Sequence, residues 1–218
     1  MFSTLALPKA ARLRLPRRRR QLLGSALALA TSLVGAAGAT PAQAALLSTS
    51  ACNEAGLSQP FAQWGDTSSY ELVPGGDFEG SLAGWTLSGG AQRVAGSEPY
   101  GVTGSVGAYS LGLPAGASAQ SPFTCVDAAY PTFRFFARNA SLTSALVAQV
   151  VYRTVLGTVD LPLGAVALDG AWEPTLPMLT GSIVTGALAG GTAEVALRFT
   201  ELTGSSQIDD VFVDPRMH

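Results

Sequence analysis

The chain has 218 residues, of which 13% are charged and 47% are hydrophobic, and its formal net charge is −2. It contains a single histidine, His218, at the last position. A Ser-His-Asp or Cys-His catalytic arrangement would have to rest on that terminal residue, so the composition argues against these classes of enzyme.

The first 44 residues have the pattern of a signal peptide. Seven basic residues lie between Lys9 and Arg20, residues 21–39 form an apolar run, and Ala42-Gln43-Ala44 fits the A-x-A cleavage pattern. We therefore expect export, with a mature protein that is secreted or held in the cell envelope. Arg19-Arg20 leaves both the Sec and the twin-arginine routes open, and an uncleaved anchor helix is the alternative to cleavage.

Cleavage would change the charge of the protein. All seven charged residues before position 45 are basic, so the remaining 174 residues carry six Arg, no Lys and 15 acidic residues, a net charge near −9. Such a chain argues against nucleic acid and anionic membrane surfaces as partners, and it is compatible with cation binding. Its length predicts one domain, which we expect to be a monomer.

Both cysteines, Cys52 and Cys125, lie in the part expected to be exported. An exported chain with two cysteines most simply forms one disulfide. The bond would close a loop of about 70 residues, which contributes about 4 kcal/mol in the chain-entropy model. It would tie a polar N-terminal arm, residues 45–67, to the body of the protein. A metal site is the alternative for the two thiols.

From residue 68 to residue 218 the pattern is that of a β protein. Glycine and proline recur roughly every 8 to 12 residues, and only residues 182–188 fit a short helix. This predicts an all-β fold, a two-sheet antiparallel β-sandwich of the jelly-roll type with about ten strands. The expected strands are residues 69–73, 84–87, 91–95, 108–113, 117–126, 132–139, 144–155, 158–166, 172–179, 193–202 and 206–213.

Two motifs near the ends of this region resemble those of a known family. Gly76-Asp77-Phe78-Glu79, followed by Gly84-Trp85, resembles the opening N-G-D-F-E…G-W segment of galactose-binding-like jelly rolls, which include carbohydrate-binding modules of families 4, 9 and 22. Ile208-Asp209-Asp210-Val211 resembles their closing I-D-D-V strand. One departure is Gly75, which stands where the family often has Asn. The resemblance implies that the first loop lies against the last strand.

The resemblance also implies one structural calcium ion where that loop meets that strand. Calcium prefers hard oxygen ligands, and by position these would be Glu79 and Asp209, with Asp77 and the carbonyls near Gly75 as weaker candidates. We leave out Asp210, because adjacent residues on a strand point to opposite faces. The alternative is that Asp77 and Glu79 are solvated turn residues and that Asp209 caps a loop through backbone N–H groups.

A second set of candidate residues lies on the predicted central strands. In residues 132–139, Phe133, Phe135 and Ala137 share one face. If neighbouring strands align, the polar residues opposite them line one ligand-binding face, with arginine forks for hydroxyl groups and one phenylalanine as a stacking plane. This set is Arg134, Phe136, Arg138, Gln149, Arg153 and Arg198. The alternative is that these arginines form cross-strand ion pairs with Glu194, Asp160 and Glu201.

These observations predict a secreted, non-catalytic module that binds carbohydrate or another extracellular surface ligand. One alternative is a structural or adhesive exported protein that has lost sugar binding. A hydrolase is the third interpretation, but a glycosidase needs two carboxylates across a cleft, and the pattern places no such pair.

Overall fold

The computed structural model describes residues 56–127, 132–154, 156–180 and 192–215. The predicted signal peptide, Cys52 and the expected helix at 182–188 lie outside these residues, so the disulfide between Cys52 and Cys125 stays a prediction. No helix among the described residues is long and apolar enough to cross a membrane. The elements are η1 (Ala62–Trp64), β1 (Glu71–Leu72), β2 (Thr86–Ser88), β3 (Gln92–Ala95), β4 (Tyr109–Pro114), β5 (Ser118–Gln120), β6 (Thr124–Asp127), β7 (Thr132–Asn139), β8 (Leu146–Thr154), β9 (Gly157–Ala165), β10 (Glu173–Pro174), β11 (Met178–Leu179), β12 (Thr192–Glu201) and β13 (Ser205–Asp214).

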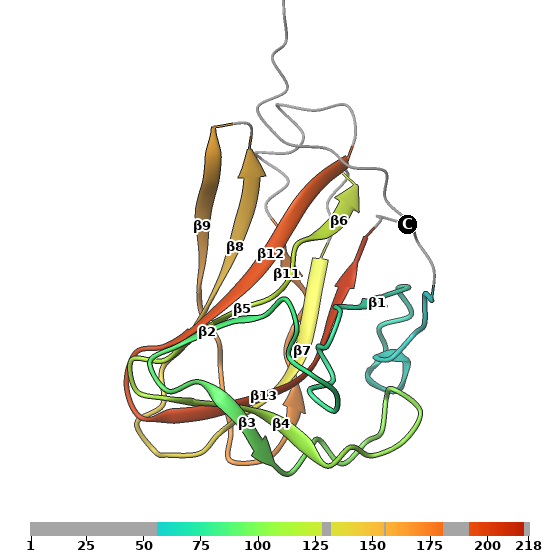
Figure 1. Cartoon of the computed structure of the whole chain (residues 1–218). Helices are drawn as coiled ribbons and strands as arrows, with labels where there is room; N and C mark the ends of the chain where they lie inside the picture. Colours follow the sequence, from blue (N-terminus) through green and yellow to red (C-terminus); the bar gives the residue numbers. More distant parts are fainter. Residues whose placement is uncertain (1–55, 128–131, 155, 181–191, 216–218) are drawn as a thin grey trace, which may run out of the picture. The chain divides into compact units, whose positions relative to one another are not determined.

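Two antiparallel sheets pack face to face, which confirms the predicted all-β sandwich (Figure 1). Sheet 1 has the strand order β10-β7-β13-β4-β3, with β1 paired to β13 and β11 paired to β7. Sheet 2 has the order β2-β5-β12-β8-β9, with β6 paired to β12. The last two strands of the chain, β12 and β13, are therefore central strands of different sheets.

Proline divides two of the expected strands. The expected strand at 117–126 is two strands, β5 and β6, separated at Ser121-Pro122-Phe123, and the one at 172–179 is divided into β10 and β11 before and after Pro177. Proline has no N–H for a ladder hydrogen bond, so it interrupts pairing where the sequence alternation continues. By contrast, the strand expected at 132–139 is confirmed at both ends by β7.

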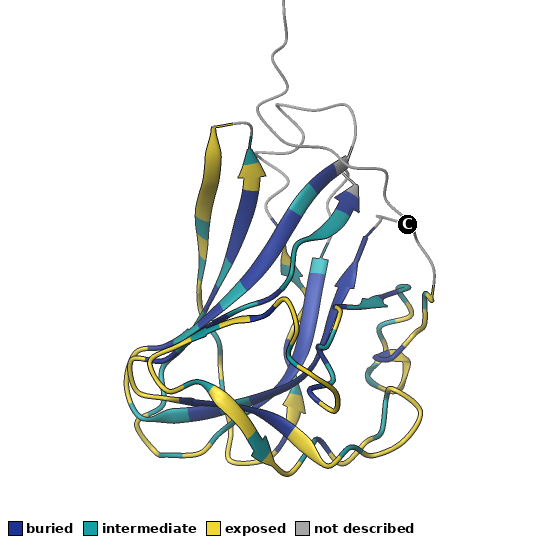
Figure 2. Ribbon diagram, viewed as in Figure 1, coloured by how far each residue is buried: buried dark blue, intermediate teal, exposed yellow. Residues whose placement is uncertain are grey.

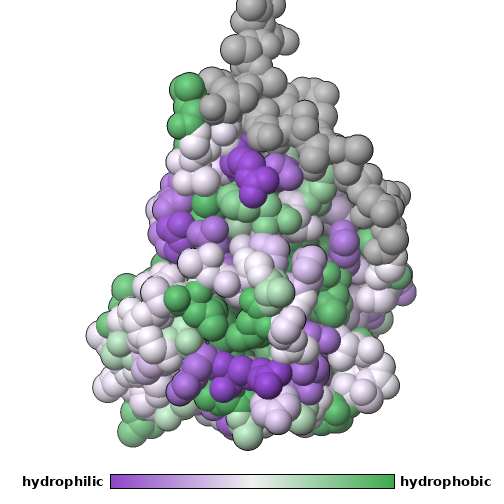
Figure 3. Space-filling model, viewed as in Figure 1, coloured by the Kyte–Doolittle hydropathy of each residue, from purple (hydrophilic) through white to green (hydrophobic). Residues whose placement is uncertain are grey.

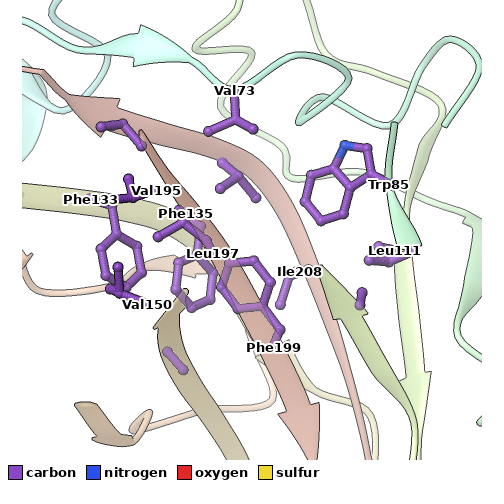
Figure 4. Close-up of a cluster of buried hydrophobic side chains, with 14 of the residues drawn as sticks. Val73, Trp85, Leu111, Phe133, Phe135, Val150, Val195, Leu197, Phe199 and Ile208 are labelled. Carbon is purple, nitrogen blue, oxygen red and sulfur yellow. The ribbon is translucent and has the colours of Figure 1, made fainter. Parts of the chain in front are cut away.

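The hydrophobic core lies between the two sheets. Alternate residues of β7, β8, β12 and β13 point into this space, and the rings of Phe135 and Phe199 meet edge to face with centroids 4.8 Å apart (Figure 4). Figure 2 shows that the buried residues follow β7, β12 and β13, whereas β9 is largely exposed. Burying apolar area in this layer is the main favourable contribution to folding.

Sheet 1 is also buried over part of its outer face. Residues 56–67 fold over the outer side of β7, held by an isolated bridge between Ser58 and Tyr70. Phe136, which alternation places opposite the core, is fully buried beneath this segment, 5.6 Å from the ring of Phe61 and 5.4 Å from that of Trp64. A second, smaller apolar cluster therefore joins the N-terminal segment to β7 and β13.

A buried ion pair fixes the N-terminal segment. Arg134 Nη1 lies 2.7 Å from Asp66 Oδ2, and the Arg134 guanidinium stacks 4.2 Å above the ring of Phe61. Burial raises the pKa of Asp66, but hydrogen bonds from Tyr70, Arg134 and Ser68 outweigh this and lower the pKa below its ordinary value. Asp66 is thus ionised where it contacts the buried guanidinium of Arg134.

We expect Asp66→Ala to lower the free energy of unfolding by about 3 kcal/mol or more, because it leaves a buried guanidinium without its partner. Chemical denaturation measures this change. Glu194→Ala is the matched control, since its partner Arg153 has a side chain that is 46% exposed, and loss of such a surface pair changes stability by less than about 1 kcal/mol. Equal effects of the two substitutions would contradict this role of the buried pair.

Candidate ligand-binding face

The six predicted ligand-binding residues do not share one sheet. Arg134, Phe136 and Arg138 lie on β7 in sheet 1, whereas Gln149, Arg153 and Arg198 lie on β8 and β12 in sheet 2. The prediction of a single common face is therefore wrong. Alternation identifies the two sides of β7, β8 and β12 correctly, but it does not say which strands are neighbours, and β7 pairs with β13 rather than with β8.

The sheet 2 residues form a surface whose charges are already paired. Arg198 contacts the carboxylate of Asp160 and donates from Nη2 to Gln120 Oε1 at 2.7 Å, and Arg153 Nη1 lies 3.0 Å from Glu194 Oε2. Figure 3 shows hydrophilic side chains gathered over β8, β9 and β12. These are two of the cross-strand ion pairs that the alternative interpretation predicted.

Two further residues complete the description of sheet 2. Gln149 is the cross-strand partner of Arg198. Glu201, the third expected partner, is fully buried and accepts a hydrogen bond from the backbone N–H of Ala145 at 2.6 Å instead of meeting an arginine. Most of the charged and hydrogen-bonding side chains described on this face therefore already have partners within the protein.

On sheet 1, four residues form a row across four neighbouring strands. Arg138 of β7 is the partner of Gln207 on β13, Gln207 is the partner of Gly112 on β4, and Gly112 is the partner of Gln92 on β3. Cross-strand partners point to the same side of a sheet, and the residues flanking Gly112 point into the core. The row, called the polar row below, therefore lies on the outer face.

Aromatic residues border the polar row at the β7 end. The guanidinium carbon of Arg138 lies 5.1 Å from the centre of the Trp172 ring. The hydroxyl of Tyr100 donates to the backbone oxygen of Trp172 at 3.0 Å, and 44% of Tyr100 is exposed. The row thus runs from an aromatic border, where a ring is open to solvent, toward the edge strand β3.

A shallow groove of about 210 Å³ lies at the other end of the row, with Gln92, Gly112 and Gln207 in its lining. A Cβ atom at Gly112 would lie 2.9 Å from a methyl carbon of Val94, so glycine both avoids this clash and lowers the floor of the groove. Only Arg138 of the polar row was identified from the sequence. Its other members come from segments far apart in the chain, and only strand pairing brings them together.

The first loop and the last strand meet as the sequence motifs imply. The N–H of Val211 donates to the carbonyl of Gly76 at 3.0 Å, and the N–H of Val73 donates to the carbonyl of Val211 at 2.9 Å. The indole N–H of Trp85 donates to the carbonyl of Pro74 at 2.9 Å and closes the loop. A Cβ at Gly76 would lie 2.9 Å from the Val211 oxygen, so this close approach requires glycine.

A β-bulge changes the direction of the acidic pair on β13. The pairing of β13 with β7 shifts register between Asp209 and Phe212, and Asp210 has a φ of 44°. Ile208 and Val211 both point into the core, so the side chains of the two aspartates between them point to the outer face of sheet 1. The expectation that Asp209 and Asp210 point to opposite faces is therefore wrong at this site.

The carboxylates at this junction are held by hydrogen-bond donors. Glu79 Oε1 accepts from the N–H groups of Ala108 and Tyr109, both at 2.7 Å, and Asp77 Oδ1 accepts from the N–H of Glu79 at 3.3 Å. Asp209 Oδ2 accepts from Ser97 Oγ at 2.7 Å and from the N–H of Glu98 at 2.9 Å. These are the contacts of capping groups.

The predicted calcium site offers carboxylate and carbonyl oxygens at the junction of the first loop and the last strand. Among the described residues, no three His, Cys, Asp or Glu side chains are grouped so that they could hold a metal ion. The predicted site combined Glu79 and Asp209 with backbone carbonyls and with Asp77 as a weaker ligand, so calcium binding there stays a prediction. A melting temperature that is higher in millimolar Ca²⁺ than in EDTA would support it.

The pKa values of the acidic pair, Asp209 and Asp210, are raised above the ordinary value for aspartate. Burial raises the pKa of Asp209 to about 7. Burial raises that of Asp210 to about 9, with further contributions from the charges of Asp209 and Glu98. Both shifts favour retention of a proton by the buried pair in the folded protein, and a protonated Asp210 carboxyl group can donate its hydrogen bond to Glu98.

This shift predicts a pH dependence of stability. Because both folded pKa values lie above the ordinary value of 3.8, the folded state binds more protons than the unfolded state, and stability falls as the pH rises from about 4 to 9. In EDTA, we expect the melting temperature of Asp210→Asn to fall less between pH 5 and pH 9 than that of the unchanged protein. Asp160→Asn, on the exposed face of sheet 2, is the control for the change in charge. A slope as steep in Asp210→Asn as in the control would contradict the assignment.

Comparison with known proteins gives a likeness in fold. No protein-family model and no curated protein matches the chain. Among solved structures, it is similar to the CBM22-1 and GH10 modules of Clostridium thermocellum endo-1,4-β-D-xylanase 10B in complex with xylohexaose, at 14% identity and a TM-score of 0.47 over 65% of this chain and 28% of that one. The chain is similar in fold to carbohydrate-binding modules.

For two of the similar structures, the match covers nearly the whole of the other chain. One is the CBM22-1 xylan-binding domain of Paenibacillus barcinonensis Xyn10C, at 13% identity and a TM-score of 0.44 over 65% of this chain and 93% of that one. The other is TmCBM61 in complex with β-1,4-galactotriose, at 13% identity and a TM-score of 0.39 over 66% of this chain and 98% of that one. At these identities the ligands named belong to those proteins.

Proposed function

We propose that the protein is an exported, non-catalytic binding module that holds carbohydrate on the outer face of sheet 1. The observation that carries this proposal is the polar row of Arg138, Gln207, Gly112 and Gln92, bordered by Trp172 and Tyr100. The row offers hydrogen-bonding groups along a line, with an exposed aromatic ring at one end.

This combination suits the chemistry of a sugar. A sugar ring presents hydroxyl groups, each a donor and an acceptor, around its edge and apolar C–H groups on its faces. Glutamine amides can both donate and accept, the guanidinium donates several hydrogen bonds, and an aromatic ring packs against apolar C–H surface. A binding site needs a few such polar groups in fixed positions beside apolar surface.

Two features favour binding over hydrolysis and favour sheet 1 over sheet 2. The polar row contains no carboxylate, so it has no general acid or nucleophile of the kind that glycosidases use. The arginines on sheet 2 are paired with Asp160 and Glu194, and a ligand there would have to displace those contacts.

Gln92→Ala tests the site, because Gln92 is an exposed residue of the edge strand β3 and contributes little to folding. Its loss should weaken retention on the best glycan of a plant, fungal and bacterial polysaccharide panel by about fivefold, since one hydrogen bond contributes about 1 kcal/mol. Gln149→Ala makes the same change on the outer face of sheet 2 and should leave retention unchanged.

The panel itself tests the function. Retention of the unchanged protein on none of the glycans would contradict carbohydrate binding and would favour a structural or adhesive protein. Weaker retention for Gln149→Ala but not for Gln92→Ala would place the ligand on sheet 2 and contradict the site.

A further inference from the structure

One member of the polar row carries a positive charge that no described acidic residue neutralises. Three of the other described arginines have a carboxylate partner within 4.0 Å, in the pairs Arg134–Asp66, Arg153–Glu194 and Arg198–Asp160. Arg93 donates to the carbonyls of Glu79 and Gly80 and lies over the ring of Tyr109. Within residues 56–127, 132–154, 156–180 and 192–215, the only side-chain acceptor that Arg138 meets is the neutral Gln207 Oε1.

The contacts of Arg138 fix the orientation of its guanidinium and leave one edge of it open. Nε and Nη2 both donate to Gln207 Oε1, at 2.9 and 2.7 Å, so the amide oxygen occupies the edge formed by these two nitrogens. The ring of Trp172 supports the guanidinium from one side. Nη1 makes no hydrogen bond within the described residues, so the edge formed by Nη1 and Nη2 remains available for a bidentate acceptor.

The acidic residues on the same face do not supply that acceptor. Asp209, Asp210 and Glu98 are at most 3% exposed. Asp209 and Glu98 accept hydrogen bonds from backbone N–H groups of residues 98, 101, 102 and 210, and Asp210 bonds with Glu98. Glu173 on β10 is the partner of Ala137, next to Arg138 in sequence, yet it makes no ion pair with Arg138. The open edge of the guanidinium therefore has no acidic partner among the described residues.

We propose that the polar row selects glycans that carry carboxylate groups, that is, chains containing uronic acid residues. The sugar carboxylate would meet the Nη1–Nη2 edge of Arg138 as a bidentate pair, the geometry for which guanidinium is best suited. The hydroxyl groups of the same chain would meet the amides of Gln207 and Gln92. This inference rests on the proposed function and adds a charge requirement to it.

The test compares each acidic glycan with its own methyl ester, which has the same sugar chain without the charge. The probes are oligogalacturonate, oligoalginate and a glucuronate-substituted xylo-oligosaccharide, each as free acid and as ester, measured by calorimetry with the purified protein. We expect the acid form of at least one probe to bind roughly tenfold or more tightly than its ester, since a charged hydrogen-bonded pair contributes more than a neutral one. The preference should shrink as salt is added.

Two substitutions assign the preference to this arginine. Arg138→Gln removes the charge, and Gln207→Glu supplies an internal carboxylate that would pair with Arg138, so each should abolish the difference between acid and ester. Arg153→Gln and Gln149→Glu make the same changes on sheet 2 and should leave the difference intact. Thermal melting shows whether each variant is folded, and the second substitution keeps the test decisive if the first does not fold.

The outcomes separate the two proposals. Equal binding of acids and esters, or binding of neutral glycans alone, overturns the charge requirement and leaves carbohydrate binding standing. An acid preference that survives both Arg138→Gln and Gln207→Glu overturns the assignment to the polar row. Absence of binding to every acid, ester and neutral glycan overturns both proposals.

Discussion

The register of β13 between β7 and β4 determines what the outer face of sheet 1 can do. Because Gln207 is opposite both Arg138 and Gly112, residues from four segments form one continuous row. A slip of one residue would turn Gln207 into the core and Ile208 out of it, so the burial of Ile208 fixes the register and the row together. The candidate site is in this sense a consequence of core packing.

A short distance along the same strand, the bulge interrupts the regular alternation that forms the polar row. It releases Asp209 and Asp210 to the outer side while Ile208 and Val211 stay in the core. Burying two carboxyl groups side by side is unfavourable when both are ionised, so burial raises the pKa of both groups, the charge of Asp209 raises that of Asp210 further, and retention of a proton by the pair is favoured. The bulge also lets Val211 pair with the first loop through Gly76. The two end motifs of the sequence therefore meet at a structural junction, separate from the polar row.

The N-terminal segment determines which part of sheet 1 remains open. It covers Phe136 and Arg134 and stops short of Arg138, whose guanidinium is left beside Trp172. The Asp66–Arg134 pair anchors that segment. Two arginines that look equivalent in sequence, four positions apart on one strand, thus have different roles. Arg134 holds the protein together, and Arg138 faces outward with part of its hydrogen-bonding capacity unused by the described residues.

The resemblance of the two end motifs to those of galactose-binding-like jelly rolls implied that they meet. The sequence pattern itself predicted the fold class and most strand positions, because these depend on local alternation and on turn residues. Residues 132–139 show this well, since their two faces are assigned correctly. The six predicted ligand-binding residues come from both sheets, because alternation carries no information about which strands are neighbours. Arg198 and Arg138 were therefore assigned to one face although they lie on different sheets. The prediction that Asp209 and Asp210 point to opposite faces was wrong because of the bulge, which the residue types of the strand do not indicate. Gln92, Gly112 and Gln207 have no local signal, and only the pairing of distant strands reveals them.

The most direct test of this account is to follow side-chain nuclear magnetic resonance signals as the uronate oligosaccharide that binds most tightly in calorimetry is added to the protein. The account predicts that the amide signals of Gln92 and Gln207 and the Nε–H signal of Arg138 shift together with one dissociation constant. The amide signals of Gln149 and Gln120 on sheet 2 should stay in place. Shifts confined to Gln149 and Gln120 would contradict the account.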